Sequence, residues 1–313
     1  MTPKKILVPV DFSYHANGAM RLALALANRW TAHLTVLHVD PLPGVGTVAV
    51  EPVFIPPNLF EGLHTEHDAK VEANLREIRD ELVRDTGHGV DVTTIRRRSE
   101  PVSGIVAYAR EWGADLMLMG SQGASGFTHL LLGSTAEKVS RIAPCPVLIC
   151  GSADDIDEQP RSFRRVVAAI DYSEFSTPVA RLAVQFVEPG GLVELVHIAG
   201  EPVLSALNAS LGGSRDDMLA LAESVREAQV GRIEEFSREL DNTDVHIAHY
   251  VGSGTPAAAI LARAEQSNAD LIVLGAHSRA GLSERIIGTV ADRVLRHARV
   301  PVLLDPEAAL SGT

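Results

Sequence analysis

Cysteine, aromatic residues and positive charge are all scarce in this sequence of 313 residues. It has two cysteines, 4% aromatic residues and a formal net charge of −12 at pH 7. Its longest basic run is three arginines, residues 96–98. Because affinity for nucleic acid comes mainly from neutralising phosphates, no nucleic-acid partner is expected. With so few aromatic residues, the core must consist of aliphatic side chains, which is typical of parallel strands covered by helices on both faces.

Long apolar runs are missing as well. No run reaches the roughly 18 residues that a membrane span needs. The first residues pass directly into a predicted strand, without the apolar segment and cleavage site of a signal peptide. We therefore expect a cytoplasmic protein without a membrane span. Cys145 and Cys150 are five apart on one predicted strand, so they should point to opposite faces, remain unpaired and hold no metal.

The chain contains an internal duplication. Residues 5–13 match residues 165–173, and residues 113–120 match residues 268–275. Between these matches the segment at 151–161 is polar, acidic and without periodicity, as expected of a linker. The sequence therefore predicts two domains, at 1–150 and 162–306, joined by the linker 151–161.

Each half alternates predicted strands with predicted helices. In the first half we expect strands near 4–10, 33–39, 90–96, 115–119 and 146–150. We expect helices at 14–30, 63–85, 102–112 and 134–142. Ser13 is suited to cap the first helix, and Pro101 stands where a helix start tolerates proline best. This alternation predicts an α/β fold with a parallel sheet and right-handed crossovers.

A glycine-rich loop follows the fourth predicted strand and returns at a helix start. It contains Gly120, Gly123, Gly126 and Gly133, and Ser134 and Thr135 follow. Amide groups at a helix start lack internal partners and favour anions, and glycine lets a phosphate approach the backbone. A P-loop would have lysine after its last glycine, and a Rossmann loop would follow the first strand. Neither signature is present.

The pattern G-x2-G-x9-G-[ST], together with Asp11 closing the first strand, resembles the universal stress protein family. The resemblance covers nearly the whole chain, as two copies. It implies that each half is a doubly wound five-stranded parallel sheet in the order 3-2-1-4-5, of the adenine nucleotide alpha hydrolase-like type. It further implies that Pro9, Asp11 and Val39 line an adenosine, that the glycine loop holds phosphates, and that a divalent cation such as Mg²⁺ accompanies them. Met119, which precedes Gly120, is included in this expected site.

The second half departs from the pattern at two positions. Ser278 stands where Gly123 stood, and Ala169 replaces Pro9. The matching site residues are Asp171, Ile198, Gly275, Ser278, Gly288 and Thr289. Because a serine Cβ crowds a phosphate, we expect the second site to bind nucleotide less reliably than the first.

Several residues have structural alternatives. Asp11 is also placed to cap the following helix. His38 and His197 recur at equivalent strand ends, where a structural role is favoured over catalysis, because no nucleophile recurs beside them. His64 and His67 are three apart on a predicted helix, but no third metal ligand is evident, so a solvated surface is the favoured interpretation.

Three functions follow from these observations. The preferred hypothesis is an ATP-binding regulator of the stress response, with no catalytic residue, since a recognisable base, arginine finger and P-loop lysine are missing. The alternatives are a slow ATPase or phosphotransferase that uses Asp11, and a nucleotide-free assembly module. The resemblance also implies that residues 146–150 and 301–305 pair within the chain as a pseudo-dimer, and that chains pair again as a homodimer.

Overall fold

The structure of the chain is a computed structural model. It describes residues 2–41, 57–87, 89–121, 132–150, 162–199, 215–238, 240, 244–276 and 287–306, without the side chains of 57–64, 215–222, 225 and 226. Statements below about what is absent refer to these described residues.

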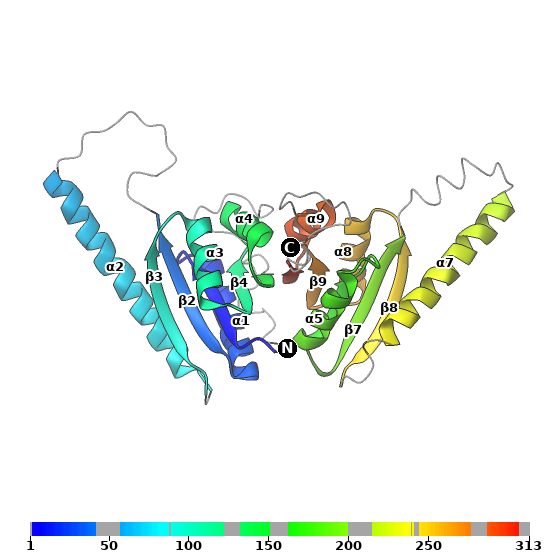
Figure 1. Cartoon of the computed structure of the whole chain (residues 1–313), viewed down its shortest axis with the longest axis horizontal. Helices are drawn as coiled ribbons and strands as arrows, with labels where there is room; N and C mark the ends of the chain where they lie inside the picture. Colours follow the sequence, from blue (N-terminus) through cyan, green and yellow to red (C-terminus); the bar gives the residue numbers. More distant parts are fainter. Residues whose placement is uncertain are drawn as a thin grey trace.

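Both halves have the same order of elements, and Figure 1 shows them side by side. The first half consists of β1 (Lys5–Val10), α1 (Tyr14–Trp30), β2 (His33–Asp40), α2 (Pro57–Arg84), β3 (Val92–Arg98), α3 (Pro101–Trp112), β4 (Leu116–Gly120), α4 (Ser134–Ile142) and β5 (Val147–Cys150). The second consists of β6 (Phe163–Ala169), α5 (Ser176–Phe186), β7 (Val187–Ala199), α7 (Arg215–Arg238), β8 (His246–Ser253), α8 (Pro256–Gln266), β9 (Leu271–Gly275), α9 (Thr289–His297) and β10 (Val302–Asp305). The predicted elements of the first half are therefore confirmed, although α2 begins six residues earlier than expected and β3 is shifted by two.

The strands form one sheet in the order β3-β2-β1-β4-β5-β10-β9-β6-β7-β8. Within each half the neighbouring strands are parallel and follow the expected order 3-2-1-4-5. The halves join through β5 and β10, which pair antiparallel with Leu148 opposite Leu303. The expected pairing of the last strands is thus present, and it merges the two predicted sheets into one.

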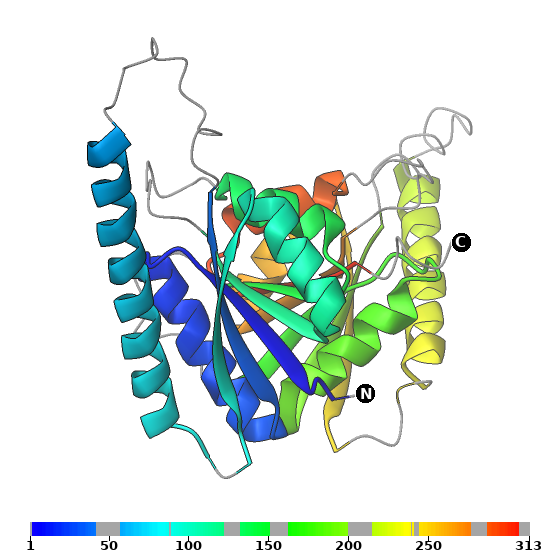
Figure 2. The ribbon, with the colours of Figure 1, turned by 60° about the vertical axis from the view of Figure 1, so that its left-hand side comes forward.

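Helices cover both faces of this sheet, and each face has its own hydrophobic core. One core contains buried side chains of α1, α2, α5 and α7, and the other contains those of α3, α4, α8 and α9. Figure 2 shows α1 and α2 on the same side of the first half. Leu148 and Leu303 belong to the first core and are fully buried, so that core continues from one domain into the other. The predicted linker 151–161 lies outside the described residues.

Helix α1 of the first half also contacts the second half directly. The Arg29 guanidinium donates to the backbone oxygens of Phe186 (2.8 Å) and Val187 (2.5 Å). Since the last carbonyls of a helix have no partner within it, Arg29 caps the end of α5. The Trp30 ring packs edge-on against Phe186, with 5.0 Å between ring centroids. On the other face of the sheet, Arg296 of α9 donates to Glu137 of α4 at 2.9 Å.

Both cysteines are buried and unpaired. Cys145 precedes β5 and lies in one core, whereas Cys150 ends β5 and lies in the other. The expectation of opposite faces is confirmed, although Cys145 is outside the strand. Burial raises the pKa of each thiol to about 12, which leaves both unreactive as nucleophiles at neutral pH. None of the helices, within the described ranges, is long and apolar enough to cross a membrane.

Candidate functional site

The carboxyl ends of β1 and β4 meet at the point where the winding of the first half reverses. These strands are neighbours in the sheet, and their helices α1 and α4 cover opposite faces. Asp11 follows β1 and is exposed, while Gly120 ends β4. Val39, near the end of β2, is 8% exposed. The structure thus places three of the predicted site residues at one edge of the sheet, the usual ligand position in open α/β folds.

The turn between β1 and α1 is held by side chains. Asp11 Oδ1 accepts from the Ser13 backbone amide at 3.0 Å, and Ser13 Oγ accepts from the Ala16 amide at 3.3 Å. Ser13 is therefore the helix cap, as expected, and Asp11 supports the turn that precedes the helix. Phe12 between them has a φ of 60°, which is unusual for a residue with a side chain.

The same turn recurs between β6 and α5. Asp171 Oδ1 accepts from the Ser173 amide at 2.9 Å, and Tyr172 has a φ of 59°. The Ser176 hydroxyl also lies 3.3 Å from Asp171 Oδ1. The left-handed conformation at the same place in both copies shows that this turn is a conserved feature of the duplicated unit and not a local irregularity.

The ends of the glycine loop are clamped identically in the two halves. The Gly133 amide donates to the Ser121 carbonyl at 2.7 Å, and the Gly288 amide donates to the Ala276 carbonyl at 2.9 Å. Helical bonding then begins with the Glu137 amide, so the amides of the preceding turn of α4 have no partner within the helix. Ser134 and Thr289 are exposed there. The predicted loop residues Gly123, Gly126 and Ser278 lie outside the described residues.

A cavity of about 180 Å³ opens at the equivalent edge of the second half. Its lining residues are Ala169, Ile170, Asp171, Ser173, Phe175, Ser176, Val179, Val196, Ile198, Pro256, Ile260, Leu274, Gly275, Gly288, Val290 and Ala291. Four of the predicted second-site residues, Asp171, Ile198, Gly275 and Gly288, are thus brought around one cavity. Thr289 begins α9 beside them without lining it. The volume is below the roughly 300–1,000 Å³ of common ligand sites, so the cavity fits part of a ligand.

Sequence reasoning missed most of the apolar wall of this cavity. Phe175, just before α5, and Ile260 of α8 line it, yet neither matches a glycine or acidic motif. Helical periodicity places such residues in a core, and only the assembled sheet shows that they also border a cavity. Pro9 and Met119, two further residues predicted for the first site, are buried.

Gly120 has a packing reason to be glycine, separate from any ligand. A Cβ at this position would lie 2.9 Å from both the carbonyl carbon and the oxygen of His15 in α1. Because these are backbone atoms, only a shift of the helix makes room. The close approach of α1 to β4 therefore depends on this glycine.

Replacing Gly120 by alanine is expected to lower the free energy of unfolding by about 1–3 kcal/mol, the usual cost of overpacking. The measurement is urea unfolding followed by circular dichroism. Gly231→Ala in α7 is the matched control, because nothing lies within 4 Å of the added methyl group. That variant should be neutral or more stable by up to about 1 kcal/mol. Equal effects of the two substitutions would contradict the packing argument.

Histidines tie the ends of the first two strands together in each half. His38 Nδ1 donates to the Val10 carbonyl at 2.8 Å, and its ring packs on Phe12 with 4.4 Å between centroids. His197 Nδ1 donates to the Ile170 carbonyl at 3.0 Å and packs on Tyr172 at 4.3 Å. This geometry agrees with the structural role favoured for these histidines, since each one contacts the residues on both sides of the aspartate.

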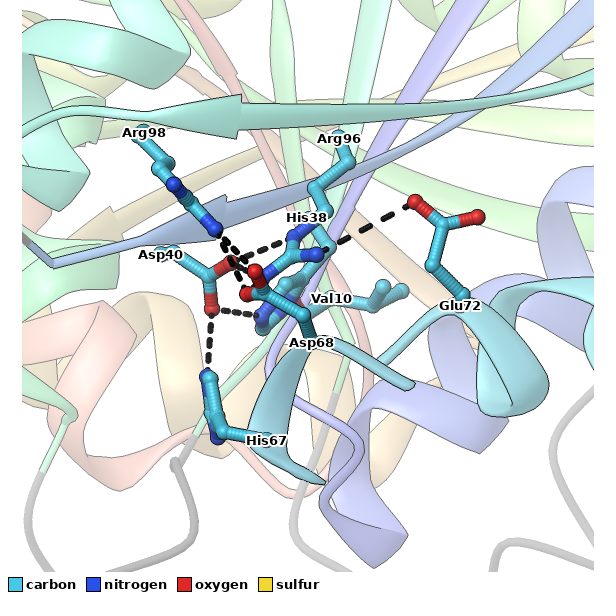
Figure 3. Close-up of polar contacts among 8 residues, drawn as sticks. All are labelled: Val10, His38, Asp40, His67, Asp68, Glu72, Arg96 and Arg98. Atoms are coloured by element: carbon cyan, nitrogen blue, oxygen red, sulfur yellow. Dashed lines mark hydrogen bonds and ion pairs between the residues drawn. The ribbon is translucent and has the colours of Figure 1, made fainter. Parts of the chain in front are cut away.

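In the first half a charged cluster extends from His38 to α2 and β3 (Figure 3). Asp40 is 3% exposed; its Oδ1 lies 3.0 Å from His38 Nε2 and 3.1 Å from His67 Nε2, and its Oδ2 accepts from Arg96 at 2.5 Å. Burial raises the pKa of Asp40, but the hydrogen bonds from Arg96, His67 and His38 outweigh it, and the pKa falls below its ordinary value. His67 is exposed, as the solvated-surface interpretation expected, and its ring also contacts a buried carboxylate from another element.

Asp68 joins the same cluster from α2. It accepts from Arg96 at 2.6 Å and from Arg98 at 2.5 Å, and these bonds lower its pKa to about 2. The sequence did not reveal this cluster, because its members come from a strand end, a helix and a second strand far apart in the chain. Only the parallel register of β2 and β3, which places His38 beside Arg96, brings them together.

The Asp68 interactions predict a specific acid sensitivity. Because the folded pKa is below the ordinary value, ionised Asp68 stabilises the fold above about pH 4, and this contribution is lost as the pH falls toward 2. Melting temperatures of the wild type and of Asp68→Asn, measured between pH 2 and 6, should differ by a constant amount above pH 4. The difference should vanish near pH 2. A difference that persists at pH 2 would contradict this assignment.

The sheet order, with a switch point in each half, defines a tandem open α/β protein. The family model of the universal stress protein family matches residues 2–151 and 162–306, and the chain belongs to this family. The universal stress protein YxiE of Bacillus subtilis is 34% identical over 149 residues, which cover 46% of this chain and 97% of that protein. A universal stress protein of Mycobacterium tuberculosis is 28% identical over 309 residues and 96% of both chains.

A solved structure shows the same fold across both halves. The universal stress protein of Archaeoglobus fulgidus superposes with a TM-score of 0.64 and 23% identity, over 97% of this chain and 96% of that one. The tandem arrangement of this chain therefore also occurs in a full-length relative and in a known structure.

Proposed function

We propose that this protein binds ATP at the carboxyl edge of each half-sheet and acts as a nucleotide-dependent regulator in the stress response. The observation that carries the proposal is the cavity of the second half, which brings Asp171, Ile198, Gly275 and Gly288 together. The residues of the first site occupy the matching strand ends. The proposal places the protein in the cytoplasm, where ATP is available.

The residues that line the cavity present three kinds of chemical group. Val196, Ile198 and Ile260 form an apolar wall suited to a purine base. Asp171 presents a carboxylate able to accept from a ribose hydroxyl. Gly288 and the start of α9 present backbone amides suited to phosphate oxygens.

Magnesium would enter with the nucleotide. In the part of the chain that the structure describes, no group of three His, Cys, Asp or Glu side chains forms a metal site. Mg²⁺ commonly binds through substrate phosphates and one or two carboxylates. Asp11 and Asp171 are the carboxylates placed beside the two sites, so they are the residues that would contact such an ion.

The lining of the cavity favours binding over catalysis. Among the described residues that border it, Asp171 is the sole ionisable one. Phosphoryl transfer typically needs a lysine or arginine that stabilises charge in the transition state. Two alternative functions stay open. One is a slow ATP hydrolysis in which Asp171 or Asp11 orients water, and the other is an assembly module that binds no nucleotide.

Calorimetric titration of the full chain with Mg²⁺ and ATP separates these functions. The regulator hypothesis predicts saturable binding without phosphate release over many hours. Steady phosphate release that disappears in Asp11→Ala or Asp171→Ala would establish the ATPase. If ATP gives no binding heat and displaces no fluorescent ATP analogue, the assembly module is the function supported.

A further inference from the structure

His38 connects the turn of the first site to a buried carboxylate. Its Nδ1 donates to the carbonyl of Val10, the residue before Asp11, and its Nε2 lies 3.0 Å from Asp40 Oδ1. The ring also packs against Phe12, the residue after Asp11. His38 therefore contacts the chain on both sides of the site aspartate, and its own orientation is fixed by Asp40.

Asp40 in turn is held by groups from outside β1 and β2. Arg96 of β3 donates to one carboxylate oxygen, and His67 of α2 lies 3.1 Å from the other. Figure 3 shows these side chains converging on Asp40 from the strand on one side and the helix on the other. A buried carboxylate needs such partners, since leaving it unpaired is costly. Displacement of α2 would therefore remove one of the partners that position Asp40.

Helix α2 is anchored at the same place. Asp68, next to His67, accepts from Arg96 and Arg98 of β3, and Glu72 one turn later has an oxygen 3.9 Å from Arg96. Val71 and Leu75 are 3% and 5% exposed, so the helix also buries apolar surface. Arg96 donates both to Asp68 on α2 and to Asp40 on β2, so it links the helix to the buried carboxylate.

We propose that Asp40 and His38 are positioning residues of the first nucleotide site, through which the docking of α2 holds the β1–α1 turn and Asp11. The proposal rests on the proposed function for its effect on nucleotide. The mechanical part concerns the chain alone: α2 holds Asp40, Asp40 holds His38, and His38 holds the turn.

The second half has the histidine clamp but different residues behind it. His197, Ile170 and Tyr172 reproduce the contacts of His38, Val10 and Phe12. At the position of Asp40 stands Ala199, and Val251 and Ser253 stand where Arg96 and Arg98 pair with β2. Asp40 and its strand partners therefore have no counterparts at the matching positions of β7 and β8, and the turn at 171–173 serves as an internal comparison.

Hydrogen–deuterium exchange of the full chain tests the mechanical part. The reporters are the amides of Ser13 and Ala16, whose partners are the Asp11 carboxylate and the Ser13 hydroxyl. Asp68→Ala should speed exchange in α2 and at these two amides by about twofold to fivefold, the size expected for loss of one exposed ion pair. The Ser173 amide of the second half should be unchanged. Asp40→Asn should speed the same two amides.

Arg79→Ala is the matched control on the same helix. Arg79 pairs with Asp80, and both are at least half exposed, away from the cluster. This variant should leave the Ser13 and Ala16 amides unchanged. Faster exchange in α2 of Asp68→Ala with unchanged Ser13 and Ala16 amides would overturn the proposal. No change at these amides in Asp40→Asn would overturn it as well.

A nucleotide titration tests the functional part separately. With the second site disabled by Asp171→Ala, adding Asp68→Ala should weaken ATP binding at the first site by about twofold to fivefold. With the first site disabled by Asp11→Ala, adding Asp68→Ala should leave ATP binding at the second site unchanged. Equal effects on both sites would overturn the positioning role. If the wild type binds no ATP, the proposed function fails, while the exchange experiment still decides whether α2 holds the turn.

Discussion

Replacing Leu303 by alanine is expected to lower the free energy of unfolding by about 2–5 kcal/mol. Leu303 is fully buried and lies directly opposite Leu148 where β10 pairs with β5. The substitution opens a cavity in the core that runs through both domains, and surrounding side chains relax into it only partly. Urea unfolding monitored by circular dichroism measures the loss.

The same variant should affect both domains. Because Leu148 and Leu303 pack together across the junction, amide exchange should become faster in β5 as well as in β10. Val83→Ala is the control: this side chain is 50% exposed and should change stability by less than about 0.5 kcal/mol. Faster exchange restricted to the second domain would show that the halves are independent and would contradict the continuous core.

Replacing Asp171 by alanine is expected to weaken ATP binding at the second site by about tenfold to a hundredfold. This is the size expected for loss of a charged hydrogen bond, about 1.5–3 kcal/mol. Asp171 is the one ionisable residue lining the described cavity, and it also accepts from the Ser173 amide that shapes the turn. Competition between ATP and a fluorescent analogue, on the full chain, measures the affinity.

Asp11→Ala is the reciprocal control for this experiment. Each single variant should leave one site intact, so a biphasic isotherm should lose a different phase in each. The double variant should lose both. Unaltered affinity in the double variant would show that ATP, if it binds, binds elsewhere.

The fold was largely predictable because its signals are local or repeated. Hydrophobic strand runs, the Ser13 cap and the proline that begins α3 each act within a few residues, and the duplication presented most of these signals twice. The order 3-2-1-4-5 and the pairing of β5 with β10 came from the family resemblance, and the structure agrees with both. Helix α2 begins earlier than expected, at Pro57, because proline at a first helical position is a start signal that the prediction of this helix did not use.

The candidate site was predictable only in part. Asp171, Ile198, Gly275 and Gly288 were found because they belong to a repeated pattern, and the structure gathers them around one cavity. Phe175 and Ile260 were not found, because an apolar residue that borders a cavity has the same sequence pattern as one inside a core. The packing role of Gly120 against His15 was also hidden, because it depends on how closely α1 approaches β4.

The Asp40 cluster shows the limit of sequence reasoning most clearly. His67 looks like a surface residue of a charged helix, and residues 96–98 look like a basic run. Arg96 and Arg98 are matched by Asp40 and Asp68, and His67 contacts Asp40, only once β2 and β3 pair in register and α2 packs beside them. Such long-range matching of charges has no local pattern in the sequence. The expectation that the second site binds nucleotide less reliably than the first stays a prediction.

Native mass spectrometry of the intact chain, equilibrated with Mg²⁺ and ATP, tests the central claim most directly. At an ATP concentration just sufficient to fill both wild-type sites, the account predicts masses shifted by up to two nucleotides in the wild type, mainly by one in Asp11→Ala and in Asp171→Ala, and little or no shift in the double variant. A wild-type mass without nucleotide at saturating ATP would contradict it, as would the same nucleotide count in the wild type and the double variant.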